Sequence, residues 1–317
     1  MSSNAGEIVD QAYRWILGRE ADPDGRAFYV GAVERGQLDA ARLRRLFLDC
    51  DEFQSGPSLT VVESDGVHVV VDPNEPDFGA TIAHHGTWEP TIGQLIEDSL
   101  PVGGVFIDVG GNVGVMSFRA ARKVGPGGRV FAFEPNPLNV DRFLRGVIAN
   151  ALTNVTLFPV AASDRTGPVF TLKNSNGKVV AATDVLQAEN ASQAMVPDDL
   201  LVHLDRIDLV KLDIEGFEVQ ALRGLTATLA RHRPKVLCEF NPVCLRPHGG
   251  VEPEVLADLI FSMTGRVTVI HGDEFLGEVD SAAALMDLWR HRDAAIAATG
   301  HLPAGWTHFD LFFQVDR

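Results

Sequence analysis

The stretch Val105-Phe-Ile-Asp-Val-Gly-Gly-Asn-Val-Gly-Val115 decides the fold of this chain. Its apolar first half is typical of a buried parallel strand, and a helical pattern begins directly after it at Met116. The glycines in between allow a tight turn and let the backbone approach a ligand closely. The stretch therefore predicts a strand–turn–helix unit of the kind that binds nucleoside cofactors in doubly wound α/β folds.

An acid in front of the glycine turn narrows the class of ligand. Asp108 ends the apolar run, and the turn that follows contains Gly110, Asn112 and Gly114. In dinucleotide folds such a turn places a pyrophosphate at a helix N-terminus, where the helix dipole favours negative charge. A carboxylate suits the ammonium of an amino-acid group better, so the pattern favours S-adenosylmethionine. An NAD-dependent oxidoreductase is the disfavoured alternative.

A second acid strengthens this interpretation. Glu134 ends the next apolar run, about twenty residues beyond the turn, where an acid accepts hydrogen bonds from a ribose diol. The carboxyl ends of neighbouring parallel strands meet in one cleft, so Asp108, the turn and Glu134 predict a single cofactor site. The third predicted strand ends at Ala161-Ala162-Ser163-Asp164. Its small residues leave room for adenine, and Ser163 and Asp164 are candidates to contact the adenine amine; the alternative is an ordinary turn.

Composition excludes several classes of protein. The chain has 317 residues, a net charge of −16 and no apolar run as long as a membrane span. This acidity disfavours nucleic acids and anionic membranes as partners. The N-terminus lacks the pattern of a secretory signal, and the three cysteines are scattered and odd in number. These features predict a cytoplasmic protein without disulfides.

The chain divides into two predicted domains, residues 1–56 and 57–317. An apolar helical face runs through Glu7–Leu17, and Gly18 is the predicted helix stop. Ser55-Gly56-Pro57 breaks the helical pattern and marks the predicted boundary. The first domain is therefore expected to be small and entirely helical.

This helical segment has a resemblance of its own. Residues 8–54, with the segments Tyr13–Tyr29 and Phe47–Phe53, resemble a small domain of unknown function that is similar to phycobilisome-linker modules. The resemblance implies a role in self-association or in a contact with another protein. Asp22 and Asp24 are interpreted as a turn with a helix cap, because a calcium loop would need further ligands.

The second domain shows the alternation of an α/β protein. Leu59–Glu63 and Val67–Val71 flank an Asp-Gly turn, which predicts a β-hairpin. Further strands are predicted at 105–109, 129–133, 155–160, 207–212, 235–240, 266–271 and 308–315. Helical patterns separate most of them, which predicts a mostly parallel sheet covered by helices on both faces.

The region from about Gly86 to Asn241 resembles the FkbM family of S-adenosylmethionine-dependent methyltransferases. The motifs that carry the resemblance are Trp88-Glu89-Pro90, Phe106–Gly114, Phe133-Glu134-Pro135-Asn136, Ala161–Asp164 and Lys211–Glu218. It implies a class I methyltransferase fold with an antiparallel last strand, and methyl transfer to a sugar or natural-product hydroxyl. Through these motifs Glu89, Pro135 and Asn136 join the candidate cofactor residues. Gly111 departs from the alanine that is common in the family.

A hydroxyl becomes a good nucleophile only when its proton leaves, so the chain should supply a base. Asp213 and Glu215, after the fourth predicted strand, are candidates, because paired acids raise the pKa of one member. The alternative is that one caps a helix while the other pairs with Lys211. His85, in a predicted loop before Trp88, is a third candidate, with an ordinary surface histidine as the alternative.

A magnesium ion is a further alternative for activating the hydroxyl. Asp213, Glu239 and Asn241 have the oxygen ligands that magnesium prefers, although substrate hydrogen bonding explains them as well. No metal ligands are assigned.

The sequence thus predicts an S-adenosylmethionine-dependent O-methyltransferase that acts on a sugar, glycan or secondary metabolite. Methylation of a carboxylate or an amine, on a small molecule or a peptide, stays open. A scaffold protein that binds the cofactor without catalysis also stays open.

Overall fold

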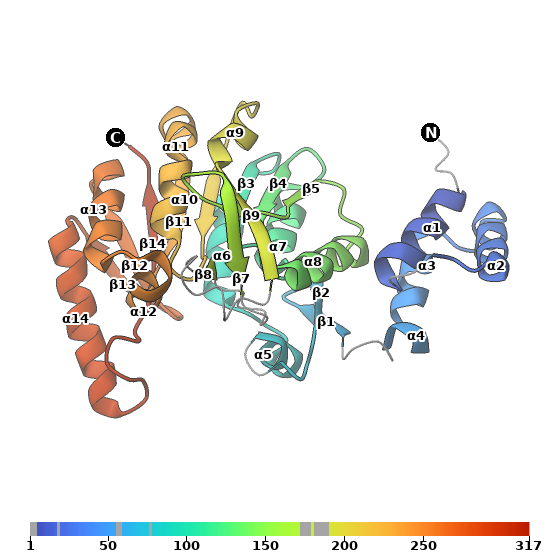
Figure 1. Ribbon diagram of the computed structural model, residues 1–317, viewed down its shortest axis with the longest axis horizontal. Coiled ribbons are helices and arrows are strands. Elements are labelled where there is room, and N and C mark those ends of the chain that lie inside the picture. Colours follow the sequence, from blue (N-terminus) through green and yellow to red (C-terminus); the bar gives the residue numbers. More distant parts are fainter. Residues whose placement is uncertain are drawn as a thin grey trace.

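The computed structural model describes residues 5–17, 20–54, 59–75, 78–171, 179–180 and 190–316. The predicted helix stop at Gly18 and the predicted boundary at Ser55-Gly56-Pro57 lie outside these residues. Along the long axis of the molecule, the N-terminal helices lie at one end and α14 (Ala282–Thr299) at the other, with the main sheet between them (Figure 1). Within the described residues, no helix combines the length and the apolar character needed to cross a membrane.

The main sheet has eight strands. Their spatial order is β13 (Glu274–Val279), β12 (Val267–His271), β14 (Phe309–Gln314), β11 (Lys235–Phe240), β10 (Leu209–Leu212), β3 (Val105–Val109), β4 (Arg129–Phe133) and β5 (Val155–Phe158). The five strands from β11 to β5 are parallel, and β14 runs antiparallel between β11 and β12. This order, with a reversed last strand, confirms the predicted α/β class I methyltransferase fold.

Strand alternation buries both faces of the sheet. Phe106 belongs to the core beneath one layer of helices, and its neighbour Ile107 belongs to the core beneath the other layer. The first layer consists of α5 (Phe78–His85), α6 (Pro90–Ser99), α7 (Val115–Val124) and α8 (Pro137–Ala149). The second layer contains α9 (Pro197–Leu201), α10 (Glu218–Gly224), α11 (Thr226–His232), α13 (Pro253–Met263) and α14. Two short turns, α12 (Pro242–Cys244) and the π-helical η2 (Leu245–Gly249), follow β11.

A smaller sheet follows the third parallel strand. Its order is β6 (Ala161–Ala162), β9 (Asn190–Met195), β7 (Gly167–Thr171) and β8 (Val179–Val180). The sequence did not predict it, because strands such as Asn190-Ala-Ser-Gln-Ala-Met195 are polar and carry little apolar periodicity.

The N-terminal segment is helical, as predicted. It forms α1 (Ala5–Ile16), α2 (Pro23–Glu34), α3 (Ala40–Leu48) and α4 (Asp51–Gln54). Asp22 caps α2 by accepting a hydrogen bond of 2.8 Å from the backbone N–H of Gly25, which confirms the helix-cap interpretation. The likeness to phycobilisome-linker modules stays a prediction.

These helices share a core with the rest of the chain. The predicted hairpin is present as β1 (Thr60–Ser64) and β2 (Val67–Val71), and Val70 of β2 is buried among residues of α1 and α3. Residues Ile148 and Ala149 of α8 pack against the same cluster. Arg145 of α8 also donates a hydrogen bond to the carbonyl of Ile16. The division at residues 56 and 57 therefore stays a prediction about chain organisation, since packing continues across it.

Phe47→Ala should loosen this shared core. Phe47 is 2% exposed, and its ring lies 4.8 Å from that of Tyr13 and 4.9 Å from that of Tyr29. Losing a buried Phe costs about 3–5 kcal/mol. We expect faster hydrogen exchange in both α1 and α8, measured by mass spectrometry, while the exposed control Leu46→Ala changes neither. Unchanged exchange in α8 would show that the helical segment is energetically separate.

Candidate active site

The glycine turn has the conformation that its sequence predicts. Gly110 and Gly114 have φ values of 93° and 103°, in the region that disfavours residues with a side chain. A Cβ on Gly110 would lie 1.9 Å from the carbonyl oxygen of Asp213, and one on Gly114 would lie 2.1 Å from the ring of Phe118. Close packing of the turn against β10 and α7 therefore requires glycine at both positions.

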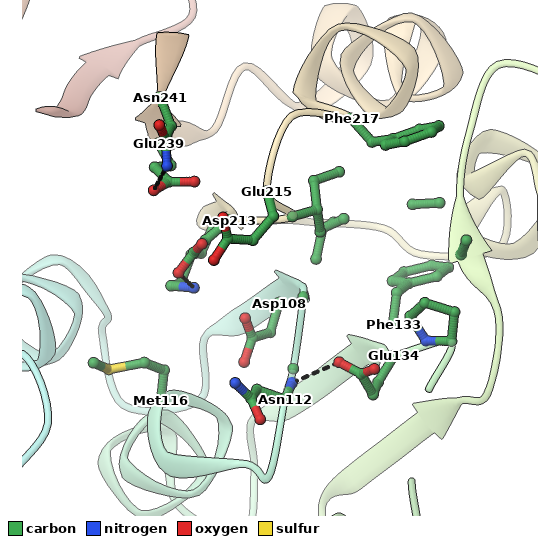
Figure 2. Close-up of a pocket in the computed structure, with 18 of the residues that line it drawn as sticks. Asp108, Asn112, Met116, Phe133, Glu134, Asp213, Glu215, Phe217, Glu239 and Asn241 are labelled. Atoms are coloured by element: carbon green, nitrogen blue, oxygen red, sulfur yellow. Dashed lines mark hydrogen bonds and ion pairs between the residues drawn. The ribbon is translucent and has the colours of Figure 1, made fainter. Parts of the chain in front are cut away.

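A cavity of about 310 Å³ opens at the carboxyl ends of β3, β4, β10 and β11 (Figure 2). This volume lies at the lower end of the range for small-molecule sites. The predicted site residues that line it are Glu89, Asp108, Gly110, Asn112, Glu134, Pro135, Ser163, Asp213 and Glu215. Gly114, Asn136, Asp164 and His85 are predicted site residues that do not line it.

Asp108 lies at the floor of the cavity with one oxygen unused. It is 1% exposed, and the Ser117 hydroxyl donates a hydrogen bond of 2.6 Å to Oδ2. Its Oδ1 is buried without a hydrogen-bond partner in the described part of the chain. Burial raises the pKa of Asp108, although Lys211 opposes this. A buried acceptor of this kind fits an ammonium group supplied by a ligand.

Glu134 joins the glycine turn to the next strand. Its two oxygens accept backbone hydrogen bonds from Asn112 at 2.9 Å and from Asn136 at 2.8 Å (Figure 2 shows the first). Burial raises the pKa of Glu134 to about 7, against the effect of these donors. The Asn139 side chain also hydrogen-bonds this carboxyl, and its remaining lone-pair capacity can accept a ribose hydroxyl. The side chain of Asn136 caps α8 by accepting a hydrogen bond from the N–H of Leu138. Its backbone N–H is the group that holds Glu134.

The opposite wall of the cavity is apolar and suits an adenine ring. Its members are Phe133, Ala161, Ala162, Val169 and Phe217, with Ser163 beside them. Asp164 is exposed and does not line the cavity, although the Ser163 hydroxyl donates a long hydrogen bond of 3.4 Å to its Oδ1. The aromatic residues of this wall were missed from the sequence, because they follow the period of ordinary core strands and helices.

Asp213 and Glu215 both face the cavity, but by a turn and not by strand alternation. β10 ends at Leu212, and Glu215 has a φ of 55°. The buried carboxyl of Glu218 holds this turn by accepting hydrogen bonds of 3.1 Å from the N–H groups of Ile214 and Gly216. The turn therefore presents the carboxyl groups of both Asp213 and Glu215 to the cavity.

Lys211 is paired within the same site. Its Nζ lies 2.9 Å from Oδ2 of Asp213, and the residue is 5% exposed. Burial disfavours the ammonium, but the carboxylates of Asp213, Asp108 and Glu89 outweigh that effect and raise the pKa of Lys211. The lysine is therefore a fixed positive charge, and its pair with Asp213 is the alternative that the sequence left open for one of the two acids.

Glu239 and Asn241 extend the polar end of the cavity. Asn241 Nδ2 donates a hydrogen bond of 3.0 Å to Glu239 Oε1, and both residues line the cavity (Figure 2). Glu239 Oε2 and Asn241 Oδ1 are buried without hydrogen-bond partners among the described residues. Within those residues no group of three or more His, Cys, Asp or Glu side chains is arranged to hold a metal ion. The magnesium alternative that included Asp213 gains no support.

Glu89 lies at this polar end as well. Burial raises its pKa to about 8, and Asp213, Asp310 and Glu215 add to the shift while Lys211 opposes it. These neighbours place Glu89 with the acids that follow β10 and not with the glycine turn. A sequence motif alone does not reveal this, because Asp310 comes from the last strand of the chain.

The backbone around Glu89 is constrained from two sides. Glu89 has a φ of 45° and precedes α6 without capping it by its side chain. Asp65, in the hairpin turn, accepts a hydrogen bond of 3.0 Å from the Thr87 hydroxyl. Arg119 of α7 binds Glu97 of α6 at 2.7 Å. Glu89, Asn112 and Glu215 all line the cavity and all have a left-handed backbone conformation. Such strain is typical of functional sites.

The structure corrects the prediction about His85. The predicted loop is helix α5, and both His84 and His85 are exposed at its C-terminal end. His85 does not line the cavity, so it is not placed to act as a base there. Trp88 does line it and packs on Phe78, with ring centroids 4.4 Å apart. A different histidine, the exposed His308 before β14, lies at the cavity and was not predicted.

Comparison with known proteins agrees with this geometry. The fold is that of a class I methyltransferase. Residues 108–246 match the family model described as the methyltransferase FkbM domain. This match agrees with the resemblance that the sequence motifs carry.

Individual relatives are distant. The chain is 24% identical over 202 residues to the hexuronic acid methyltransferase AglP of Haloferax volcanii, covering 59% of this chain and 74% of that protein. The methyltransferase FkbM structure from Methylobacillus flagellatus KT is 16% identical, with a TM-score of 0.41, covering 98% of this chain and 60% of that one. The structure of M. jannaschii TYW2 in complex with AdoMet is 12% identical, with a TM-score of 0.42 and coverages of 83% and 88%.

Two neighbouring glycines provide a matched test of the turn. Gly110→Ala would force a Cβ to within 1.9 Å of a backbone oxygen, whereas the nearest atom to a Cβ on Gly111 is a Phe143 ring carbon at 3.1 Å. We expect Gly110→Ala to weaken S-adenosylhomocysteine binding at least about tenfold, from strain of about 1–3 kcal/mol. Gly111→Ala should bind almost normally in calorimetry. Equal losses in both variants would contradict the described turn.

The buried acids also predict a pH dependence of stability. A carboxyl with a raised folded pKa stabilises the protein fully below its unfolded pKa, which is 4.5 for glutamate, and this contribution is lost as the pH rises through the folded value. The folded values are about 8 for Glu89 and about 7 for Glu134. The Tm of the ligand-free protein should therefore fall from about pH 5 to about pH 8. Glu89→Gln should make the fall shallower, and an unchanged slope would count against the burial of Glu89.

Proposed function

We propose that the protein is an S-adenosylmethionine-dependent O-methyltransferase whose acceptor is a hydroxyl of a sugar, glycan or secondary metabolite. The observation that carries the proposal is the buried, unpartnered Oδ1 of Asp108 beside the glycine turn. It fits the ammonium of an amino-acid group, which NAD lacks. The distant relative named as a hexuronic acid methyltransferase supports a sugar-like acceptor.

Each part of the cavity has a role in this proposal. Asp108 holds the amino-acid end of the cofactor, and Glu134 holds the ribose. The apolar wall around Phe133 and Phe217 encloses the adenine, with Ser163 near its amine. The cofactor supplies a methyl group on a sulfonium, which is a good leaving group. Most of the catalysis is then orientation of the acceptor oxygen in line with that methyl group.

Glu89 is the proposed general base. Its pKa of about 8 makes it a stronger base than an ordinary carboxylate, and it lies among the groups at the acceptor end of the cavity. The acceptor hydroxyl gives its proton to Glu89 while its oxygen forms the new bond to carbon. Asp213, which is paired with Lys211, and Glu215 orient the hydroxyl. The sequence predicted Asp213, Glu215 and His85 as candidate bases, whereas this proposal gives the role to Glu89 because of its raised pKa.

The proposed partners follow from charge. Six acids and one lysine line the cavity, and the net charge of the chain is −16. This supports a small-molecule or glycan acceptor and not a nucleic acid. A base with a raised pKa supports transfer to a hydroxyl over transfer to a carboxylate, which needs no base. It also supports a catalytic role over that of a scaffold.

Asp108→Asn tests the cofactor assignment. The substitution keeps the shape of the side chain and removes the charge that an ammonium needs. We expect the affinity for S-adenosylhomocysteine to fall at least about tenfold in calorimetry, because a charged hydrogen bond contributes about 1.5–3 kcal/mol. Ser163→Ala, at the apolar end, is the control and should cost less. An unchanged affinity in Asp108→Asn would refute the site.

The pH profile of the rate tests the base. Since Glu89 must be ionised to accept a proton, kcat/KM should rise with pH through about 8. In Glu89→Gln this rise should disappear and turnover should fall about 10²–10⁴-fold, with cofactor binding retained. A variant that keeps the wild-type profile would assign the base to another group.

A further inference from the structure

The acceptor end of the cavity is rich in acids. Carboxyl groups reach it from four elements: Glu89 before α6, Asp213 and Glu215 after β10, and Glu239 on β11 line the cavity, and Asp310 on β14 lies directly behind them. Lys211 is the one lysine or arginine among the described lining residues. Titratable carboxyl groups therefore gather at the position where the acceptor must lie.

Lys211 does not neutralise this cluster. Its ammonium lies 2.9 Å from Oδ2 of Asp213, and its single charge faces several carboxyl groups. His308 is exposed at the cavity and is the other basic side chain of the lining. Burial, together with Asp213 and Glu215, raises the pKa of Glu239 well above its usual range. A positive charge bound beside Glu239 would therefore stabilise its ionised form.

Two side chains show where that charge would be bound. Glu239 and Asn241 are 9% and 7% exposed, and they are joined by the hydrogen bond between Asn241 Nδ2 and Glu239 Oε1. The remaining oxygens, Glu239 Oε2 and Asn241 Oδ1, are buried acceptors without a donor in the described part of the chain. Both residues face the cavity (Figure 2). A buried acceptor left unpaired costs free energy, so the bound ligand is expected to supply the donors.

We propose that the acceptor carries a protonated amine near the hydroxyl that is methylated, as an amino sugar or a related amino alcohol does. Its ammonium would donate to Glu239 Oε2 and Asn241 Oδ1, and its hydroxyl would face Glu89 and Asp213. The inference rests on the proposed methyl transfer and specifies its substrate class. The inference also argues against a hexuronic acid, the substrate in the name of the distant relative, as the acceptor. The carboxylate of such an acceptor would lie among the carboxyl groups of this cluster.

The test uses acceptor trios that differ in one group. Methyl glycosides of 2-amino-2-deoxyglucose, glucose and glucuronic acid, and the same trio in the galactose series, are offered to the S-adenosylhomocysteine-loaded protein for binding by calorimetry. They are then offered to the S-adenosylmethionine-loaded protein for labelled methyl transfer. We expect the amino member to bind and react at least about tenfold better than the neutral one, and the acid to be poorest. No binding by either amino sugar, or a preference for a neutral or acidic member, overturns the inference.

Variants at the proposed ammonium site separate specificity from folding. Glu239→Gln should bring the amino-to-neutral ratio of kcat/KM towards one, while S-adenosylhomocysteine affinity is retained. Asn241→Asp should increase the ratio by adding charge, and Glu278→Gln, an exposed acid on β13, should leave it unchanged. Tandem mass spectrometry must place the new methyl on oxygen, since a methyl on nitrogen would contradict the assigned orientation. Cofactor binding with transfer to neutral acceptors would refute this inference and leave the proposed function intact.

Discussion

The arrangement of the cleft depends on one buried carboxylate, that of Glu134. It accepts the N–H of Asn112 from the glycine turn and the N–H of Asn136 at the start of α8, so it fixes the two strand ends against each other. Because these donors come from backbone, the connection survives most changes of side chain. The turn can then keep left-handed backbone at Gly110, Asn112 and Gly114. The N–H groups of Gly110 and Gly111, which donate to the carbonyl of Phe133 at 3.0 Å, reinforce the same connection.

A second constraint is electrostatic. The sheet brings acids from distant parts of the chain to one edge, and burial makes their ionisation costly. Lys211 offsets part of this cost through Asp213. The remainder appears as raised pKa values, about 8 for Glu89 and about 7 for Asp310. In the proposed mechanism these raised pKa values are useful, because they give a base that titrates near neutral pH and a site that prefers cations.

The sequence predicts best where local pattern and tertiary role coincide. The run Val105–Val109 is apolar apart from Asp108, forms the first parallel strand and leads into the turn. The fold class and the pairing of Asp108 with Glu134 were therefore predicted from it. The sequence predicts the position of a side chain poorly where that position depends on packing between distant parts of the chain. His85 is close to Trp88 in sequence, yet α5 turns it outward, while Asp310 reaches Glu89 only through the order of β14 and β11.

The central claim is that this cleft binds a cationic amino-acid nucleoside against carboxyl groups with raised pKa values. The most direct measurement is calorimetry of S-adenosylhomocysteine binding at pH 6.5 in buffers of different ionisation enthalpy. The ammonium should favour ionised Asp108, and the ribose should favour ionised Glu134, so binding should release protons to the buffer. Proton release with no binding of NAD would agree with this claim. Binding of NAD in place of S-adenosylhomocysteine, or a binding heat that is independent of the buffer, would contradict it.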